Sequence, residues 1–265
     1  MKIAHLSDTH FGTEVEQVVS ALQACLISLK PDLIILSGDI TQRAKVSEFE
    51  AANQFIKSLP IAPWLTVAGN HDIALMNFFE RFFRPYKRYL SLDGAVLEPI
   101  FENEHMQIHG LKTTSRFRHV NGKITEDQIV RINDWLAKAA PHKRKMLVCH
   151  HPFDIVLDKD RKNQIINAEK ALNQWSSLGL NYIFGGHIHY PFTNTLKPNA
   201  HRSGVHIIQA GTACSSRVRN GQTNSFNLIE VGLDEPNIDV CSRYDYDAKE
   251  NAFQITMRTN LAHSF

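Results

Sequence analysis

Cysteine is scarce in this sequence. The chain has four cysteines among 265 residues, at positions 25, 149, 214 and 241, and no two of them have the C-x-x-C spacing. A disulfide framework and a thiolate zinc site are therefore excluded as the basis of the fold. We expect reduced thiols, as in a cytoplasmic protein.

A strong net charge and long apolar runs are also missing. The formal charge is +2, with 29 basic and 27 acidic residues, so the dense basic tract of a nucleic-acid-binding surface is not expected. No apolar run reaches the length of about 20 residues that spans a bilayer. Residues 2–7 already have a strand pattern, with no apolar signal core before them. We therefore expect a cytoplasmic protein with a small-molecule partner.

Hydrophobic residues make up 43% of the chain, which is enough for a sizeable core. In the first half, short apolar runs alternate with segments of helical periodicity. The predicted strands are 2–7, 33–37, 64–68 and 145–149, and the predicted helices are 15–29, 46–58 and 125–139. Thr125 and Gln128 have the spacing of a capping box at the start of the last helix.

The second half is predicted to contain strands with little helix. Its strand-like runs are 182–185, 205–210, 225–231, 237–243 and 252–258. This change of pattern favours a second sheet packed on the first, with helices outside. The predicted fold is therefore an α/β four-layer α/β/β/α sandwich of two mixed sheets. We expect a single domain over 1–265, with a cap-like insertion around 73–105.

Residues that can bind metals follow the predicted strands. The motifs are Asp8-x-His10, Gly38-Asp39, Gly69-Asn70-His71-Asp72, His150-His151-Pro152 and Gly186-His187-x-His189. Taken singly, each motif also fits an ordinary polar turn. Because ligands collect at the carboxyl ends of strands in open α/β sheets, these distant residues are expected to meet in space. Seven oxygen and nitrogen ligands are enough for two divalent ions that share one carboxylate.

These motifs, in this order, resemble those of the calcineurin-like metallophosphoesterases. The sequence is most similar to the bacterial branch of cyclic-nucleotide and glycerophosphodiester phosphodiesterases. The resemblance implies that one metal is held by Asp8, His10, Asp39 and His189, and the other by Asp39, Asn70, His150 and His187. It favours His150 over His151, because the family pattern His-x-Pro places the ligand two residues before the proline.

Phosphoester hydrolysis is the chemistry that such a site predicts. Two divalent ions outweigh the charges of Asp8, Asp39 and a bridging hydroxide by about one unit, so the site attracts a phosphate anion. The hydroxide is expected to attack phosphorus in line. Manganese, iron and zinc all suit oxygen and nitrogen ligands, and the sequence does not choose among them.

Two neighbouring residues are expected to complete the chemistry. His71 is interpreted as the general acid, or as a donor to a phosphoryl oxygen, and Asp72 as the group that fixes its tautomer. One of Arg116 and Arg217 is expected to contact substrate, although both also fit ordinary solvated loop residues. The other histidines lack partners at ligand spacing and are assigned no chemistry: His5, His105, His109, His119, His142, His201, His206 and His263.

Residues 76–90 place phenylalanines and arginines on different faces of a helical pattern, although Pro85 excludes one straight helix. Three interpretations remain open. The phenylalanines pack on the core, or the segment caps the site, or its apolar face meets a lipid substrate or a membrane surface.

Three functions compete at this stage. The leading one is dimetal hydrolysis of a small phosphodiester, such as a cyclic nucleotide, a glycerophosphodiester or a nucleotide-linked lipid precursor. The same site also fits a phosphomonoesterase or a nuclease, although the balanced charge disfavours a nucleic-acid substrate. A non-catalytic binding scaffold is the third alternative. The oligomeric state is left open.

Overall fold

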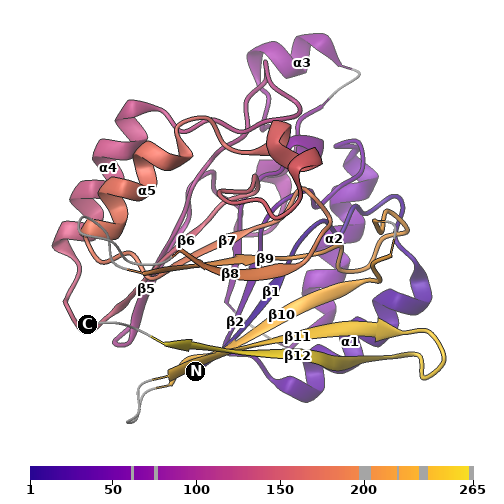
Figure 1. Cartoon of the computed structure of the whole chain (residues 1–265). Coiled ribbons are helices and arrows are strands. Elements are labelled where there is room, and N and C mark those ends of the chain that lie inside the picture. Colours follow the sequence, from indigo (N-terminus) through magenta and orange to yellow (C-terminus); the bar gives the residue numbers. More distant parts are fainter. Residues whose placement is uncertain (61–62, 75–76, 197–203, 220, 233–237, 263–265) are drawn as a thin grey trace.

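Two six-stranded sheets form the centre of the molecule in a computed structural model of the chain (Figure 1). The structure describes residues 1–60, 63–74, 77–196, 204–219, 221–232 and 238–262. The first sheet has the order β12-β11-β10-β1-β2-β3 and the second the order β4-β5-β6-β7-β9-β8. None of the helices that the structure describes has the length and apolar composition needed to cross a bilayer.

The first sheet combines strands from both ends of the chain. Strands β1, β2 and β3 run parallel, and β10 pairs antiparallel with β1. Its strands are β1 (Lys2–Leu6), β2 (Leu33–Leu36), β3 (Trp64–Thr66), β10 (Ser225–Glu230), β11 (Ile238–Asp247) and β12 (Ala252–Ala262).

The second sheet comes from the middle of the chain. Strands β5, β6, β7 and β9 are parallel, with β4 and β8 antiparallel at the two edges. Its strands are β4 (Ile100–Glu102), β5 (Met106–Gly110), β6 (Arg144–Val148), β7 (Tyr182–Gly185), β8 (Phe192–Leu196) and β9 (Val205–Gln209).

Alternation along the strands divides the core into layers. Ile3 and Ile35 lie between the sheets with Ile108 and Phe184 of the second sheet. In the first sheet, the residues that follow or precede Ile3 and Ile35 point the other way, as the period of two in a strand requires. They pack under helices α1 (Glu16–Leu29) and α2 (Val46–Ser58). Helices α4 (Glu126–Lys138) and α5 (Ala168–Ser177) cover the second sheet. The predicted four-layer sandwich is confirmed (Figure 1).

The predicted division between the halves of the chain is wrong in detail. The strands β10 to β12 join the first sheet, and β6 belongs to the second. The second half also contains helix α5, which was not predicted, although it buries Leu172 and Trp175 on one face. The capping box at Thr125 is confirmed, because its side chain accepts a hydrogen bond from Gln128 N. The first residue of the run 237–243 lies outside the described residues.

The segment after the third strand divides into two parts. Helix α3 (Phe78–Phe83) projects from the body of the molecule and buries none of its residues (Figure 1). The 3-10 helix η2 (Tyr89–Ser91) follows, and Tyr89 is fully buried with its hydroxyl donating to Thr66 O at 2.9 Å. The interpretation that the phenylalanines pack on the core is therefore wrong, because Tyr86 and Tyr89 make the core contacts. Residues 75–76 lie outside the described part.

Candidate metal centre

The predicted metal-binding residues meet where the two sheets bring their strand ends together. Asp8 and His10 follow β1, Asp39 follows β2, and Asn70 opens the 3-10 helix η1 (Asn70–Asp72) after β3. His150 follows β6 of the second sheet, and His187 and His189 follow β7. Parallel strands place their carboxyl ends at one edge of a sheet, so both sheets contribute to one site.

The first group contains Asp8, His10, Asp39 and His189, whose ligand atoms all lie within 4.8 Å of one another. His189 Nε2 is 3.1 Å from Asp8 Oδ1 and 3.2 Å from His10 Nε2. His10 Nε2 is 3.7 Å from Asp39 Oδ2. Two carboxylates and two imidazoles therefore converge on one point.

The second group contains Asp39, His150 and His187. Asp39 Oδ1 lies 3.2 Å from His150 Nε2, which is also 3.1 Å from Asn70 Oδ1 and 3.3 Å from His187 Nδ1. Asp39 thus turns one oxygen toward each group. This is the arrangement that a carboxylate shared by two cations requires.

Backbone carbonyls orient three of these imidazoles. The hydrogen bonds are His150 Nδ1 to Ser37 O (2.9 Å), His187 Nε2 to Val120 O (2.8 Å) and His189 Nδ1 to Arg217 O (2.6 Å). Because a carbonyl oxygen only accepts, each bonded ring nitrogen carries the hydrogen. In the neutral imidazoles the other nitrogen therefore presents a lone pair to the group.

This arrangement of lone pairs fits a bound cation. In their neutral forms His150 and His187 turn lone pairs toward each other, and His189 turns one toward the Asp8 carboxylate, whose buried Oδ1 has no hydrogen-bond partner. Buried polar atoms normally have partners, and a carbonyl behind each imidazole is the usual outer support of a metal ligand. The residues present therefore fit divalent cations in both groups.

The charges of the site are strongly coupled. Burial alone would raise the pKa of Asp39, but the imidazoles of His150, His71 and His10 outweigh it and hold this pKa well below its usual range. Burial opposes protonation of His150, yet the Asp39 carboxylate raises its pKa to about 9. Burial and the nearby His150 lower the pKa of His187 to about 4.

Strained backbone is concentrated in the same place. Nine non-glycine residues in the described part of the chain have positive φ, and five of them are candidate ligands: Asp8, His10, Asp39, His187 and His189. The left-handed region costs an L-residue about 1–2 kcal/mol. Such outliers collect where function requires a particular side-chain direction.

Two glycines let the loops approach closely. Gly38 has a φ of +95°, and a Cβ there would lie 2.6 Å from His150 Nδ1. A Cβ on Gly186 would collide with Ser7 Oγ and would lie 2.6 Å from Asp8 Oδ2. Both glycines therefore allow a strand end of one sheet to contact the other.

The expected contact between Asp72 and the His71 ring is not what the structure shows. His71 Nδ1 donates to Gln42 O at 2.7 Å, and this carbonyl fixes the tautomer. The buried Asp72 carboxylate instead accepts hydrogen bonds from four donors: Ile40 N, Thr41 N, Thr41 Oγ1 and Gly69 N. Burial and the nearby Asp39 carboxylate raise the pKa of Asp72 to about 7. Asp72 thus joins the loop after β2 to the loop after β3.

The two predicted arginines have different surroundings. Arg217 Nη1 lies 3.1 Å from Gln42 Oε1 and donates to His71 Nε2 at 3.2 Å, so this guanidinium borders the site. Arg116 donates to Phe82 O and lies 4.8 Å from the centroid of the Phe117 ring. It therefore connects its loop to α3, and of the two it is Arg217 that the structure places beside the candidate ligands.

Some contacts of the site were not predicted. The His119 ring lies 5.3 Å from that of His71, and Val120 O orients His187. The sequence analysis assigned His119 no chemistry, and backbone carbonyl contacts leave no sequence signal. His151 belongs to neither group, although its ring lies 4.6 Å from that of His187, and its Nδ1 is 2.9 Å from Thr113 Oγ1.

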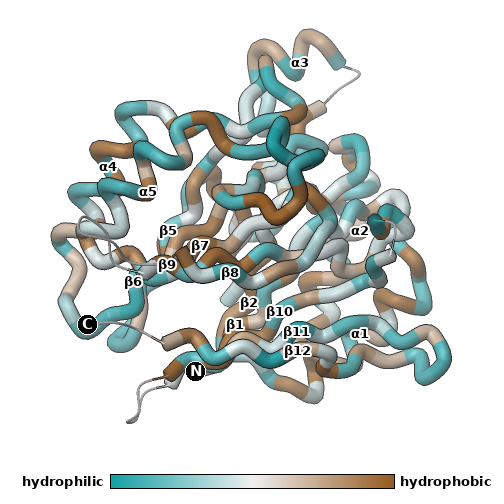
Figure 2. The backbone as a smooth tube through the Cα atoms, viewed as in Figure 1, coloured by the Kyte–Doolittle hydropathy of each residue, from teal (hydrophilic) through white to brown (hydrophobic). Residues whose placement is uncertain are grey.

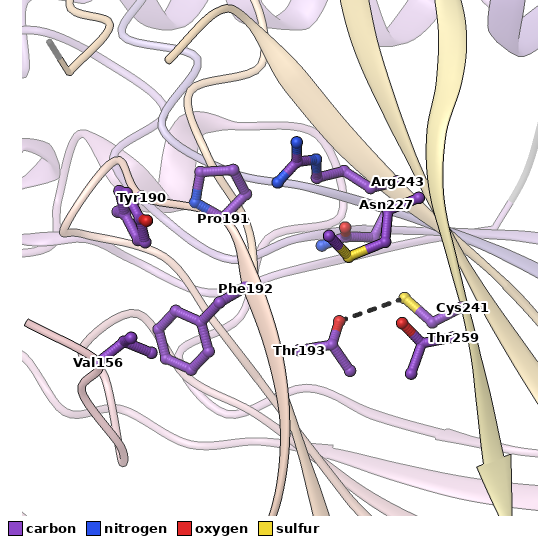
Figure 3. Close-up of a pocket in the computed structure, with 10 residues that line it drawn as sticks. Val156, Tyr190, Pro191, Phe192, Thr193, Asn227, Cys241, Arg243 and Thr259 are labelled. Atoms are coloured by element: carbon purple, nitrogen blue, oxygen red, sulfur yellow. Dashed lines mark hydrogen bonds between the residues drawn. The ribbon is translucent and has the colours of Figure 1, made fainter. Parts of the chain in front are cut away.

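A separate cavity of 220 Å³ lies between strand β8 and the strands β11 and β12 of the other sheet. Figure 3 shows Thr193 facing Cys241 and Thr259 across it. Burial raises the pKa of the Cys241 thiol to about 11, so this cysteine is no nucleophile near neutral pH. The cavity contains none of the candidate metal ligands and is interpreted as a gap in the packing of the sheets.

The two Asp/His groups at the strand ends together form a candidate dimetal centre. The profile of the calcineurin-like phosphoesterases matches residues 1–191. The chain belongs to this family. The family and the geometry indicate a dimetal centre with aspartate and histidine ligands.

The curated relatives are phosphodiesterases. The chain is 28% identical over 164 residues to a probable glycerophosphodiester phosphodiesterase of Arcobacter nitrofigilis, and 26% identical over 163 residues to the glycerophosphodiester phosphodiesterase of Enterobacter lignolyticus. A probable cyclic nucleotide phosphodiesterase of Synechococcus is 24% identical over 169 residues. The matched region covers 57% of this chain and 57% of each of the first two relatives.

Solved structures with low sequence identity share the fold. A purple acid phosphatase from yellow lupin seeds has a TM-score of 0.73 at 11% identity, and the match covers 98% of this chain and 53% of that one. A dimetal phosphatase from Danio rerio has a TM-score of 0.69 at 10% identity and covers 100% and 99% of the two chains. These likenesses concern the fold alone.

Proposed function

We propose that this protein hydrolyses a small phosphodiester with two divalent cations. One cation is held by Asp8, His10, Asp39 and His189, and the other by Asp39, Asn70, His150 and His187. The observation that carries the proposal is Asp39, whose two oxygens face the two groups separately. The similarity to glycerophosphodiester and cyclic nucleotide phosphodiesterases favours a diester substrate.

The bound cations would supply a hydroxide nucleophile at neutral pH and neutralise charge on the phosphoryl oxygens. Oxygen and nitrogen ligands suit manganese, iron or zinc. The protein contributes their positions, because the carbonyls of Ser37, Val120 and Arg217 hold the imidazoles in one orientation. The nucleophile is solvent-derived, so no covalent enzyme intermediate is expected.

His71 and Arg217 are the residues that we expect to contact the substrate. The Nδ1 atom of His71 donates to Gln42 O, so Nε2 is the atom that faces the reaction. Nε2 takes up a proton from solvent when Arg217 turns away from it, and then gives this proton to the departing alkoxide. The Arg217 guanidinium, now bonded to that atom, is positioned to turn to a non-bridging phosphoryl oxygen. Hydrolysis of an alkyl diester needs both the proton donor and the guanidinium, because an alkoxide is a poor leaving group.

The test combines metal analysis with a substrate panel. Protein reconstituted with manganese, iron or zinc is assayed with bis- and mono-nitrophenyl phosphate, cyclic nucleotides, glycerophosphodiesters and UDP-linked acyl sugars. We expect two metals per chain and preferential diester turnover. A chain that holds two metals yet turns over none of these substrates would instead be a binding scaffold, and a preference for the mononitrophenyl ester would make it a monoesterase.

Variants test the shared ligand. Asp39→Asn is expected to lose both metals, whereas His189→Ala is expected to lose only the first. His105→Ala is the matched control, because His105 is partly exposed and lies outside both groups. Full occupancy of both positions in Asp39→Asn, measured by elemental analysis, would contradict the shared role of this carboxylate.

A further inference from the structure

Five phenylalanines are exposed at the projecting end of the molecule. Four lie on α3 and the fifth on the loop after β5, and their exposed fractions are 75% for Phe78, 73% for Phe79, 48% for Phe82, 71% for Phe83 and 69% for Phe117. We call these residues the Phe patch. Figure 2 shows hydrophobic residues on α3, at the end that stands away from the sheets. Single exposed apolar residues are normal, but a contiguous patch of this kind marks an interaction surface.

Specific contacts hold the Phe patch in place. Helix α3 has six residues, too few to be stable alone, and two arginines hold it. Arg81 Nε donates to Arg116 O at 2.9 Å, and Arg116 donates back to Phe82 O. The rings of Phe82 and Phe117 meet edge to face at 5.7 Å, so the helix and the loop present one surface. These bonds direct the phenylalanines outward.

Positive charge surrounds the patch. Residues 77–90 contain four cationic side chains and a single carboxylate, Glu80, which pairs with Arg88. The exposed Arg84 and Lys87 have no ion pair among the described residues. They also line a cavity of 740 Å³ together with Phe79 and Phe83. The cavity is therefore lined both by apolar rings and by cations that have no ion pair among the described residues.

The patch lies beside the candidate metal centre. The loop that carries Phe117 continues to His119, whose ring is 5.3 Å from His71, and to Val120, whose carbonyl orients His187. A surface bound at the patch would therefore lie next to the mouth of the site.

We propose that the Phe patch docks on an anionic lipid surface. Apolar rings that enter the interface and cations that meet acidic headgroups are the two contributions that bind a peripheral protein to a membrane. A second copy of this chain is a poorer occupant, because a symmetric contact would bring Arg84 and Lys87 against the same residues. The proposal concerns binding alone and does not depend on the proposed reaction.

The experiment measures sedimentation of the full chain with vesicles. Vesicles of phosphatidylcholine alone are compared with equimolar phosphatidylcholine and phosphatidylglycerol, at low and high salt. We expect binding to the anionic vesicles, weakened by salt. Arg84→Gln with Lys87→Gln removes two exposed cations and should weaken binding about fivefold per charge. Phe79→Ser with Phe83→Ser should weaken it by about tenfold or more.

Matched controls lie on other faces. Val130→Ser on α4 and Ile255→Ser on β12 also replace exposed apolar residues and should bind like the original chain. Unchanged circular dichroism and metal content show that each variant is folded, and the glutamine variant keeps the test valid should the serine variant misfold. The proposal is overturned by a lack of binding to anionic vesicles, or by equal binding of the patch variants. Sedimentation equilibrium that shows a dimer lost in the serine variant, without vesicle binding, would assign the patch to self-association.

Discussion

Replacement of Asp72 by asparagine tests whether this residue holds two loops together or acts through His71. In the structure its carboxylate accepts four hydrogen bonds and is fully buried. An asparagine would be best placed with its amide nitrogen at the position of Oδ1, where it can donate to Thr41 Oγ1. The Thr41 N–H would then have no acceptor. One buried unsatisfied donor costs about 1–3 kcal/mol, so we expect Asp72→Asn to lower the free energy of unfolding by about 2 kcal/mol.

Asp72→Ala removes both oxygens and leaves three backbone donors without an acceptor, so its loss should be about three times as large. The assay is denaturant unfolding followed by circular dichroism on metal-free protein, because a bound ion would add its own stabilisation. Asp93→Asn is the control. Asp93 is exposed and pairs with the equally exposed Lys57, so this change should stay within about 0.5 kcal/mol.

Turnover separates the two roles of Asp72. Because Gln42 O sets the His71 tautomer, Asp72→Asn should leave the ratio of alkyl to nitrophenyl diester hydrolysis unchanged. The reasoning would be refuted if Asp72→Asn unfolded at the original denaturant midpoint and yet reproduced the leaving-group selectivity of His71→Ala. Asp72 would then act through His71, as the sequence alone suggested.

Other variants and conditions test the remaining parts of the site. His71→Ala should keep both metals and slow alkyl diesters more than nitrophenyl esters, and equal losses would remove the proton-donor role. Arg217→Ala should raise KM at least tenfold, with partial recovery in Arg217→Lys, and an unchanged KM would place the guanidinium outside the substrate contact. Gly186→Ala should lower metal occupancy, because its methyl group would collide with Ser7 Oγ. Metal affinity of the second group should fall as pH drops below about 9, the pKa of metal-free His150, by up to about tenfold per pH unit for this histidine, which a competitive chelator titration measures.

Local patterns were sufficient for most of the secondary structure. The apolar runs at 33–37 and 64–68 became strands β2 and β3, and the predicted helix at 46–58 is α2 without change. Helix α5 was missed because its short apolar stripe lies between loops. The sequence also did not predict that β10 belongs to the first sheet, because its pairing with β1 joins residues more than two hundred positions apart.

The fate of the phenylalanines on α3 shows a limit of periodicity. Their spacing is that of a helix that packs on a core, and it contains no information on whether a partner surface exists. The core positions were taken instead by Tyr86 and Tyr89, whose hydroxyls bond to Thr114 and Thr66. Exposure of the patch follows from the bonds between Arg81 and the Arg116 loop, which lie 35 residues apart.

The sequence by itself determined the chemistry available to this protein, because the types of side chain and their places after strands are local properties. The positions of Asp39 after β2 and of the histidines after β6 and β7 can be recognised from the sequence alone. The tertiary structure alone decided how that chemistry is arranged. It directs the two oxygens of Asp39 toward two groups, and it sets the imidazole tautomers through carbonyls that are distant in the sequence. It also pairs Asp72 with the backbone of the neighbouring loops and not with the ring of His71. Such contacts depend on which loops pack together, and only the packed sheets bring those loops within hydrogen-bonding distance.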